Sequence, residues 1–283
     1  MKKNILKGGT AVLGLALALT ACGAPAKSAD AKLSTIKDGV LSVGLSPDFP
    51  PMEYLDESSN QLVGVDVDIV TEIGKRTGLK VEYTQQKFDQ LINSVRTDRV
   101  DIVFSGMSDT VERQKTVDFI DYFKSVGRFY VLGANKAKYT QDTDICGQSV
   151  AVSSKTDYYP ALQRFSKDKC EGAGKPAVNI VPTDSGAAAR LQLDQGRAQA
   201  AIQGAENLVY FEKKNPGKYA MVLGNVTELP FGAATKKGNT ALQDKVVKAF
   251  QDMKTDGTLK KILDSHNVGY GLTDPVLNGS SKR

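Results

Sequence analysis

The stretch "FDQLINSVRTDRVDIVFSGMSDTVERQKTVDFIDYF", residues 88–123, sets out a strand, a turn and an arginine in close succession. Its centre is a largely apolar run, 100–104, which predicts a buried strand and stops abruptly at Ser105-Gly106. A hydroxyl-rich turn follows, and then Arg113. Two interpretations of Arg113 are open: a solvated residue at the start of a short helix, or a guanidinium that clamps a carboxylate beside the strand end.

Strand-like and helical runs alternate on both sides of this stretch. The patterns predict strands or extended runs at 41–45, 81–84, 127–133, 149–152, 178–181, 200–202, 221–223 and 231–235. They predict helices at 66–76, 88–96, 158–167, 185–195, 206–214, 240–255 and 258–265. Such alternation indicates an α/β fold with mostly parallel sheets covered on both faces. Ligands of these sheets bind outside the carboxyl ends of strands, and Ser105-Gly106 is such an end.

The first residues have the pattern of an export signal. Lys2 and Lys3 precede an apolar run, 11–19, which is too short to span a bilayer as a mature helix. We therefore predict a signal peptide at 1–21. Its last residues and Cys22, "LTAC", resemble a bacterial lipobox, in which Cys22 becomes the lipidated first residue, although an ordinary signal peptide with a chance cysteine is the alternative. Residues 22–36 would form a flexible tether to the membrane, outside the cytoplasm.

Composition restricts the chemistry of the mature chain. Its single histidine, His266, leaves almost no material for a zinc site or a Cys/His nucleophile, and we predict no metal, no cofactor and a surface or helix-capping role for His266. The net charge of +5 is spread along the chain without an aromatic-interleaved basic stripe, so nucleic acid is not an expected partner. In an exported protein the even pair Cys146 and Cys170 predicts a disulfide. About 250 mature residues favour two lobes.

Two aromatic residues follow predicted strands. Phe49 lies in "SPDFPPMEY", after the first strand, and Phe88 begins the helix after the second. Most phenylalanines are core residues, and that interpretation stays open for both. Their positions at strand ends also suit stacking on a ligand.

Linked blocks of sequence resemble one protein family. "GVDVDIVTEIGKRTGL", residues 64–79, resembles the signature of the family-3 solute-binding proteins, the polar amino-acid receptors of ABC importers. Residues 88–123 resemble the next block of that family, and "DGTLKKIL", 256–263, resembles its closing helix. The similarity covers about 40–272, nearly all of the mature chain.

The resemblance implies a two-lobed periplasmic-binding-protein fold of type II. Each lobe would hold a parallel-rich sheet flanked by helices, and two hinge strands, near 122–128 and 227–232, would join them. The implied boundaries are 37–124 and 231–272 for lobe 1, 128–227 for the inserted lobe 2, and 273–283 for a C-terminal tail.

The resemblance also implies roles for matching residues. Arg113 would bind the ligand carboxylate, helped by Ser108 and by Thr156 at a helix start in the second lobe. Gly106 would offer its carbonyl to an amine, and the two phenylalanines would stack on the ligand. This favours the clamp interpretation of Arg113. Further candidates near the same strand ends are Ser46, Asp48, Glu53, Ser105, Gln203 and Glu206.

The chain departs from the family pattern at two positions. Many relatives carry an acid for the ligand's amine where this chain has Gly204, and receptors of basic amino acids tend to carry an acid where it has Ser46. Asp157 could replace the missing counter-charge, or it could cap a helix, and both roles can hold together. Gln203 and Glu206 are weaker candidates for that charge.

The resemblance therefore implies a monomeric extracytoplasmic receptor. It would capture a small amino-acid-like carboxylate in an interlobe cleft and deliver it to an ABC permease, anchored to the membrane by a lipid on Cys22. Fold alone does not fix function, so an exported dehydratase-like enzyme remains an alternative, with Asp157 or Glu53 as its acid or base. A ligand sensor for a signalling receptor is a third interpretation.

Overall fold

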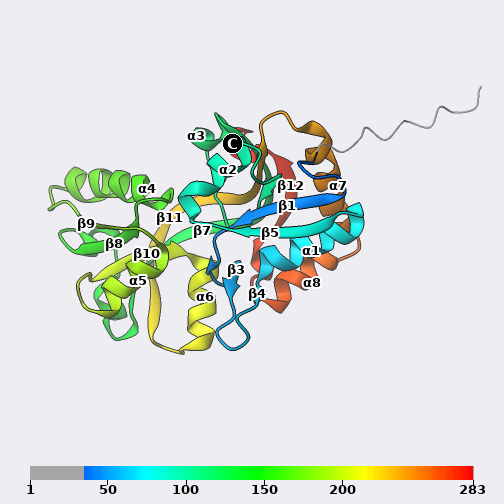
Figure 1. Ribbon diagram of the computed structural model, residues 1–283. Helices are drawn as coiled ribbons and strands as arrows, with labels where there is room; N and C mark the ends of the chain where they lie inside the picture. The colour runs from blue at the N-terminus through cyan, green and yellow to red at the C-terminus, as the bar shows by residue number, and fades with distance from the viewer. Residues whose placement is uncertain (1–34, 283) are drawn as a thin grey trace, which may run out of the picture. The chain divides into compact units, whose positions relative to one another are not determined.

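A nine-stranded mixed sheet forms the centre of the computed structural model, which describes residues 35–282 (Figure 1). The strand order is β5–β1–β6–β11–β7–β10–β8–β9, and β12 pairs with β7. The strands are β1 Val40–Leu45, β5 Lys80–Gln85, β6 Ile102–Val103, β7 Val117–Leu132, β8 Ser149–Ser153, β9 Asn179–Thr183, β10 Ala200–Gly204, β11 Tyr219–Lys236 and β12 Leu272–Leu277.

Parallel strands occur in two groups, one on each side of a central antiparallel pair. β1 pairs in parallel with β5 and β6, and β8 pairs in parallel with β9 and β10. Between the groups, β7 and β11 run antiparallel to each other. The predicted α/β class with parallel-rich sheets is confirmed, but the two expected sheets are joined into one because β7 and β11 belong to both groups.

β7 and β11 are the longest strands of the sheet. They have 16 and 18 residues and pair from Val117 opposite Lys236 to Leu132 opposite Tyr219, with register shifts between 222 and 227 and at 231/232. The sequence patterns predicted only short separate pieces of them. Pairing between segments about a hundred residues apart makes each strand continuous, and local periodicity does not report such pairing. The predicted crossings, 122–128 and 227–232, fall within these strands.

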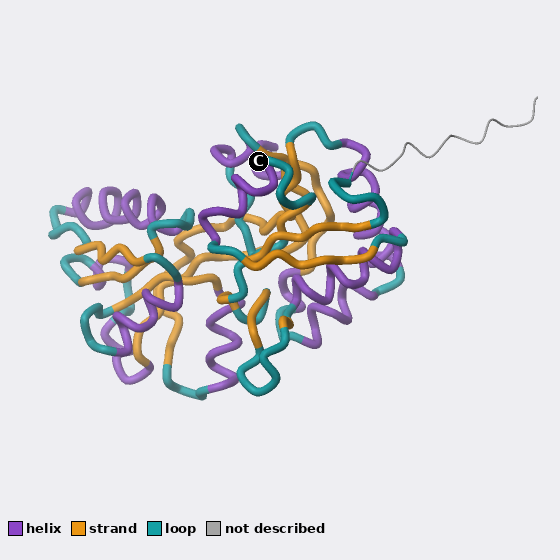
Figure 2. Tube along the Cα trace, in the orientation of Figure 1, coloured by secondary structure: helices purple, strands orange, loops and turns teal. Residues whose placement is uncertain are grey.

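Helices lie on both faces of the sheet, as Figure 2 shows by its purple and orange segments. In the first group α1, α7 and α8 share a core cluster with β1, whereas α2 packs in a separate cluster with β6. In the second group α4 belongs to one cluster, and α5 and α6 to another. The helices are α1 Val65–Thr77, α2 Leu91–Arg96, α3 Val111–Gln114, α4 Tyr158–Phe165, α5 Gly186–Asp194, α6 Ala205–Lys214, α7 Thr240–Thr255 and α8 Thr258–Ser265.

These four clusters divide the molecule into two lobes. Buried residues of the first two clusters come from 41–123 and 231–268, and those of the other two come from 129–222. We call these lobe 1 and lobe 2. The two-lobed architecture agrees with the prediction, while the exact lobe limits given above stay a prediction.

Two features of lobe 1 were not predicted. A three-stranded sheet, β2 Asp48–Phe49, β3 Glu53–Leu55 and β4 Leu62–Val63, follows β1, and β12 occupies part of the predicted tail. The strands of the small sheet have only two or three residues, too few for a recognisable alternation of apolar and polar side chains.

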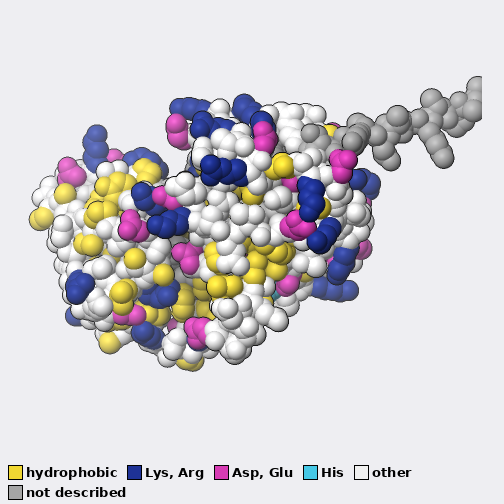
Figure 3. All heavy atoms as spheres, viewed as in Figure 1, with side chains coloured by type: hydrophobic (Ala, Val, Ile, Leu, Met, Phe, Trp, Pro, Cys, Tyr) yellow, Lys and Arg dark blue, Asp and Glu magenta, His cyan; other side chains and the backbone are white. Residues whose placement is uncertain are grey.

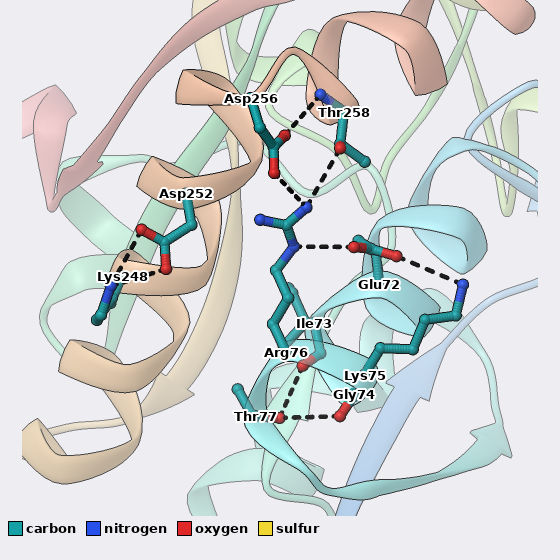
Figure 4. Close-up of polar contacts among 10 residues, drawn as sticks. All are labelled: Glu72, Ile73, Gly74, Lys75, Arg76, Thr77, Lys248, Asp252, Asp256 and Thr258. Carbon is teal, nitrogen blue, oxygen red and sulfur yellow. Dashed lines mark hydrogen bonds and ion pairs between the residues drawn. The ribbon is translucent and has the colours of Figure 1, made fainter.

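Arg76 fastens α1 to the turn between α7 and α8 (Figure 4). Its Nε donates to Glu72 Oε1 at 2.8 Å, and its Nη2 contacts Asp256 Oδ2 at 2.8 Å. Hydrogen bonds from the Thr258 hydroxyl and amide, with the Arg76 guanidinium, lower the pKa of Asp256 to about 2. These contacts join the end of α1 to the α7–α8 turn at the surface of lobe 1.

The predicted signal peptide and Cys22 lie outside the described residues. Within 35–282 no helix is both long enough and apolar enough to cross a bilayer. Cys146 and Cys170 form a disulfide in lobe 2, with their Cα atoms 5.5 Å apart. His266 lies at the C-terminal cap of α8, where its Nε2 is 2.7 Å from Asp68 Oδ2.

Candidate ligand-binding site

A cavity of about 400 Å³ lies where parallel strands of both lobes end. Residues at or just after the carboxyl ends of β1, β5 and β6 line it from lobe 1, and those at or after β8, β9 and β10 line it from lobe 2. This is the strand-end position predicted for a ligand. The lining residues are Ser46, Asp48, Phe49, Glu53, Lys87, Phe88, Asp89, Ser105, Gly106, Ser108, Ser153, Lys155, Thr156, Asp157, Tyr158, Asp184, Ser185, Gly186 and Gln203.

Gly106 and Phe49 are packed together in the lobe 1 wall. Gly106 has a φ of +47°, and a Cβ at this position would approach the Phe49 ring to 2.6 Å. Its amide donates to Asp66 Oδ2 at 2.8 Å. Only glycine tolerates both the backbone conformation and the close ring. The small residue therefore brings the Phe49 ring and the Gly106 backbone to the same point of the cavity.

A buried carboxyl pair supports this wall. Glu53 is only 1% exposed, and its Oε1 accepts a hydrogen bond from Ser105 Oγ at 2.8 Å. Burial, followed by the nearby Asp66 carboxylate, raises the pKa of Glu53 well above its ordinary value. Burial also raises the pKa of Asp66 to about 6, against hydrogen bonds donated by the Gly106 amide and the Tyr122 hydroxyl. Both shifts disfavour two full negative charges on this pair.

Asp48 and Ser46 form a second polar contact in lobe 1. Ser46 Oγ donates to Asp48 Oδ1 at 3.1 Å, and both residues line the cavity. Burial raises the pKa of Asp48 from its ordinary value, and the Ser46 hydrogen bond opposes that effect. The carboxylate of Asp48 thus lies beside Ser46, the position at which this chain lacks an acid.

Asp157 faces the cavity from lobe 2. It holds the N-cap position of α4, but its side chain makes no capping hydrogen bond. Its Oδ1 instead accepts a hydrogen bond from Ser108 Oγ of lobe 1 at 2.8 Å. Its Oδ2 is buried and has no hydrogen-bond partner among the described residues. The helix-capping interpretation of this side chain is therefore wrong.

Arg113 lies behind the cavity wall. Its side chain is half-buried, its Nη1 donates to the Ser108 carbonyl at 2.8 Å, and its guanidinium lies 5.6 Å from the centre of the Phe88 ring. Burial lowers the pKa of Arg113, and Asp157 is foremost among the neighbouring charges that oppose this. Arg113 is absent from the lining residues, whereas Ser108 and Phe88 are present. The helix after this turn is capped by Thr110, whose hydroxyl accepts from the Arg113 amide.

Glu206 fills the space beside Gly204. A Cβ at 204 would come within 1.7 Å of Glu206 Oε1 and 3.1 Å of the Tyr158 hydroxyl. The Glu206 carboxylate is fully buried, accepts from Ser125 Oγ at 3.1 and 3.2 Å, and burial raises its pKa to about 7. Neither Gly204 nor Glu206 lines the cavity, whereas Gln203 does.

Several lining residues were missed by the sequence reasoning. Asp184, Ser185 and Gly186 follow β9 directly, and Lys155 and Tyr158 follow β8. The rule that identified Ser105-Gly106, a strand ending in small or polar residues, applies equally to these ends. Of the predicted ligand contacts, all but Arg113, Gly204 and Glu206 line the cavity; Thr156 does so while its hydroxyl donates to the Ser153 carbonyl at 3.0 Å.

Comparison with known proteins gives consistent matches. Residues 41–268 match the family model described as bacterial extracellular solute-binding proteins, family 3. The L-cystine-binding protein TcyA of Bacillus subtilis is 30% identical over 255 residues, which cover 87% of this chain and 90% of that protein. Arginine-binding protein ArgT of Corynebacterium glutamicum is 29% identical over 239 residues, covering 84% and 78%. An ancestral arginine-binding protein solved with arginine superposes with a TM-score of 0.72 at 32% identity, covering 81% of this chain and 98% of that one.

Proposed function

Because this chain belongs to family 3 of the bacterial extracellular solute-binding proteins, we propose that it captures a small amino-acid-like solute and delivers it to an ABC permease. One observation carries the proposal: the strand ends of both lobes converge on a single cavity of about 400 Å³. The relatives named above bind cystine and arginine, which fit a cavity of this size. The family consists of binding proteins, not of enzymes.

In this proposal the two lobes hold the ligand between them. Phe49 and Phe88 contact it from lobe 1, and Thr156 and Asp157 contact it from lobe 2. Arg113 and Ser108 receive its carboxylate, which requires the guanidinium to reach past Ser108. β7 and β11 connect the lobes and act as the hinge, with lobe limits at 37–124 plus 231–272 and at 128–227.

The proposed location is the outer surface of the cell membrane. The family is extracellular, and the sequence from Lys2 to Cys22 has the order of a lipoprotein signal. A lipid on Cys22 would keep the receptor close to its permease, where we expect it to act as a monomer. Replacement of Cys22 by alanine should release the protein from the membrane fraction, and mass spectrometry of the parent should show the added lipid.

A thermal-shift screen tests the binding function. The protein would be heated with each of the common amino acids, with cystine and with cyclic carboxylates as non-amino-acid controls. An amino acid that binds the folded state raises the melting temperature in a concentration-dependent way. Failure of every amino acid to do so at millimolar concentration would contradict the proposal.

A further inference from the structure

Carboxyl groups outnumber ammonium groups among the residues that line the cavity. Five carboxyl groups line it, from Asp48, Glu53, Asp89, Asp157 and Asp184, against two ammonium groups, Lys87 and Lys155. Within residues 35–282, the one ion pair among these groups joins Lys155 and Asp89, at 4.0 Å. The other carboxyl groups have no lysine, arginine or histidine partner within that distance in the described chain.

The excess of negative charge in the cavity remains when Glu53 is left out of the count. Burial and the Asp66 carboxylate raise the pKa of Glu53, so we leave Glu53 out of the count of negative charges. With Asp89 paired to Lys155, three carboxylates remain, from Asp48, Asp157 and Asp184. Against them stand two cations, the lining Lys87 and the Arg113 guanidinium next to Ser108 and Asp157. The cavity therefore keeps a negative surplus without help from Glu53.

This surplus is a local property. The chain as a whole carries a net charge of +5, and on the face shown in Figure 3 lysine and arginine side chains are interspersed with acidic ones. Like charges that share a partly enclosed space repel one another, and a cation placed between them relieves that repulsion. An acidic cavity would be ordinary in a protein with a large negative net charge, but the net charge of this chain is positive.

Two of the three carboxylates are well placed for a ligand. Asp48 belongs to β2 in lobe 1, and Asp157 precedes α4 in lobe 2. Each accepts a hydrogen bond from one serine hydroxyl, and Oδ2 of Asp157 is buried without a partner in the described residues. A ligand that contacts both would join the two lobes. The aromatic rings of Phe49, Phe88 and Tyr158 line the space between and also favour cations.

We propose that the cavity selects a ligand of net positive charge, such as a basic amino acid, with its side-chain cation at Asp48 and its α-ammonium at Asp157. The proposal rests on the proposed function. The two ends are assigned by chemistry: Asp157 contacts Ser108, which with Arg113 receives the carboxylate, and an α-ammonium is one bond away from the carbon that bears that carboxylate. Asp48 is left for the far end of the ligand.

A matched pair of ligands tests the charge preference. L-arginine and L-citrulline have nearly the same shape, but only arginine carries a side-chain cation. Calorimetry on the parent protein should give arginine an affinity at least about tenfold higher than that of citrulline. L-lysine and its Nε-acetyl derivative provide a second pair of the same kind. The inference is overturned if, in both pairs, the parent's affinity for the neutral member is within about twofold of its affinity for the cation.

Three carboxylate-to-amide variants test the assignment of the two ends. Asp48→Asn should lower the affinity for arginine about tenfold and leave the affinity for citrulline within about twofold of the parent's. The preference for arginine over citrulline would then be lost. Asp157→Asn should weaken both ligands about equally, since both carry an α-ammonium. Asp244→Asn is the control, because Asp244 lies at an exposed position of α7 outside the cavity, and it should keep the parent's preference for arginine. Loss of that preference in Asp157→Asn or Asp244→Asn, with Asp48→Asn unchanged, overturns the assignment.

Failure of this inference is distinguishable from failure of the proposed function. Binding of a neutral amino acid in preference to arginine and lysine would overturn the charge selection and leave the receptor function standing. Absence of binding by every amino acid, cationic or neutral, would contradict both.

Discussion

The side chain of Glu206 occupies the space beside Gly204, which changes how the missing acid at 204 is interpreted. The sequence suggests that an acid is missing at 204, yet the carboxylate of Glu206 occupies the space that a side chain at 204 would enter. Glu206 is bound to Ser125 on β7 and lies 3.4 Å from the Tyr270 hydroxyl. A carboxyl group is therefore retained at this place, but it is turned toward β7 instead of the cavity.

The burial of Glu206 predicts a dependence of stability on pH. Its pKa is raised from 4.5 to about 7 in the folded protein, so below pH 4.5 it is protonated in both states. As the pH rises toward 7, only the unfolded chain releases the proton, and the free energy of unfolding falls by ~3 kcal/mol. Glu206→Gln removes this group, so its advantage over the parent should grow between pH 4.5 and pH 8 in denaturant unfolding.

The exposed Glu171 of lobe 2 supplies the control for this measurement. Glu171→Gln should follow the parent at each pH, since its side chain lies in solvent. Identical pH profiles for Glu206→Gln and the parent would contradict a raised pKa of Glu206.

Arg113 carries the second prediction at this scale. Its replacement by alanine should weaken binding of an amino acid by ~2–5 kcal/mol, because a buried carboxylate loses its charged partner. Folding should survive, since the side chain is half-buried and outside the core clusters. The readout is calorimetry with arginine and with argininamide, which lacks the carboxylate.

The two ligands separate a direct role of Arg113 from an indirect one. If its guanidinium binds the carboxylate, the parent prefers arginine to argininamide and Arg113→Ala loses that preference. If it acts only by positioning Ser108 through the carbonyl contact, Arg113→Ala causes no further loss of that preference in a Ser108→Ala background. Unchanged affinity for arginine would exclude both roles.

At the scale of elements, the disulfide Cys146–Cys170 closes a loop around β8 and α4. The sequence separation is 24 residues, for which the chain-entropy model gives ~3 kcal/mol of stabilisation. A protein with serine at both positions should lose about that much free energy of unfolding, measured with guanidinium. Since β8 and the start of α4 supply Thr156 and Asp157 to the cavity, looser packing of this unit should also weaken ligand binding.

The stability change of the double serine variant has a contradicting value and a control. A stability change below ~1 kcal/mol would show that the unfolded chain is not restrained by this bond. Reduction of the parent, without substitution, should reproduce the effect of the double serine variant.

At the scale of the whole molecule, contacts outside the cavity also join the two lobes. Asn207 Nδ2 of α6 donates to the Pro50 carbonyl at 2.5 Å, Lys214 lies 2.6 Å from Glu57, and Tyr54 packs edge-on against Tyr210. A receptor that closes on its ligand gains affinity from such contacts only to the extent that the open form lacks them.

Closure predicts a binding effect from a residue that does not line the cavity. Asn207→Ala removes one interlobe hydrogen bond, worth ~1 kcal/mol, and should raise the dissociation constant about fivefold, chiefly through faster release. Asn215→Ala, just beyond the far end of α6, is the matched control and should bind like the parent. Equal affinity in Asn207→Ala and the parent would show that this contact does not change between the open and closed forms.

The predictions from sequence agree with the structure where interactions join residues close in the chain, and they differ where interactions join distant residues. The run 100–104 contains β6, although the strand is only Ile102–Val103 and ends just before Ser105-Gly106. The prediction came close because apolar β-forming residues and a small-residue turn act within a few positions. The hinge strands were predicted only in fragments, because their continuity comes from pairing between 117–132 and 219–236. Arg113 follows the predicted turn, but its side chain contacts the Ser108 carbonyl and the Phe88 ring and is not among the lining residues, and the direction of such a long side chain depends on its tertiary neighbours.

The sequence by itself determined the alternation of strands and helices and the strand ends that line the cavity, because periodicity and turn residues act over short distances along the chain. The resemblance of its linked blocks indicated the family. The tertiary structure alone decided that Asp157 faces Ser108 rather than capping its helix, that Glu206 fills the space at Gly204, and that Asp48 lies beside Ser46. Each depends on where a side chain points once the lobes have packed, and long-range packing sets that direction.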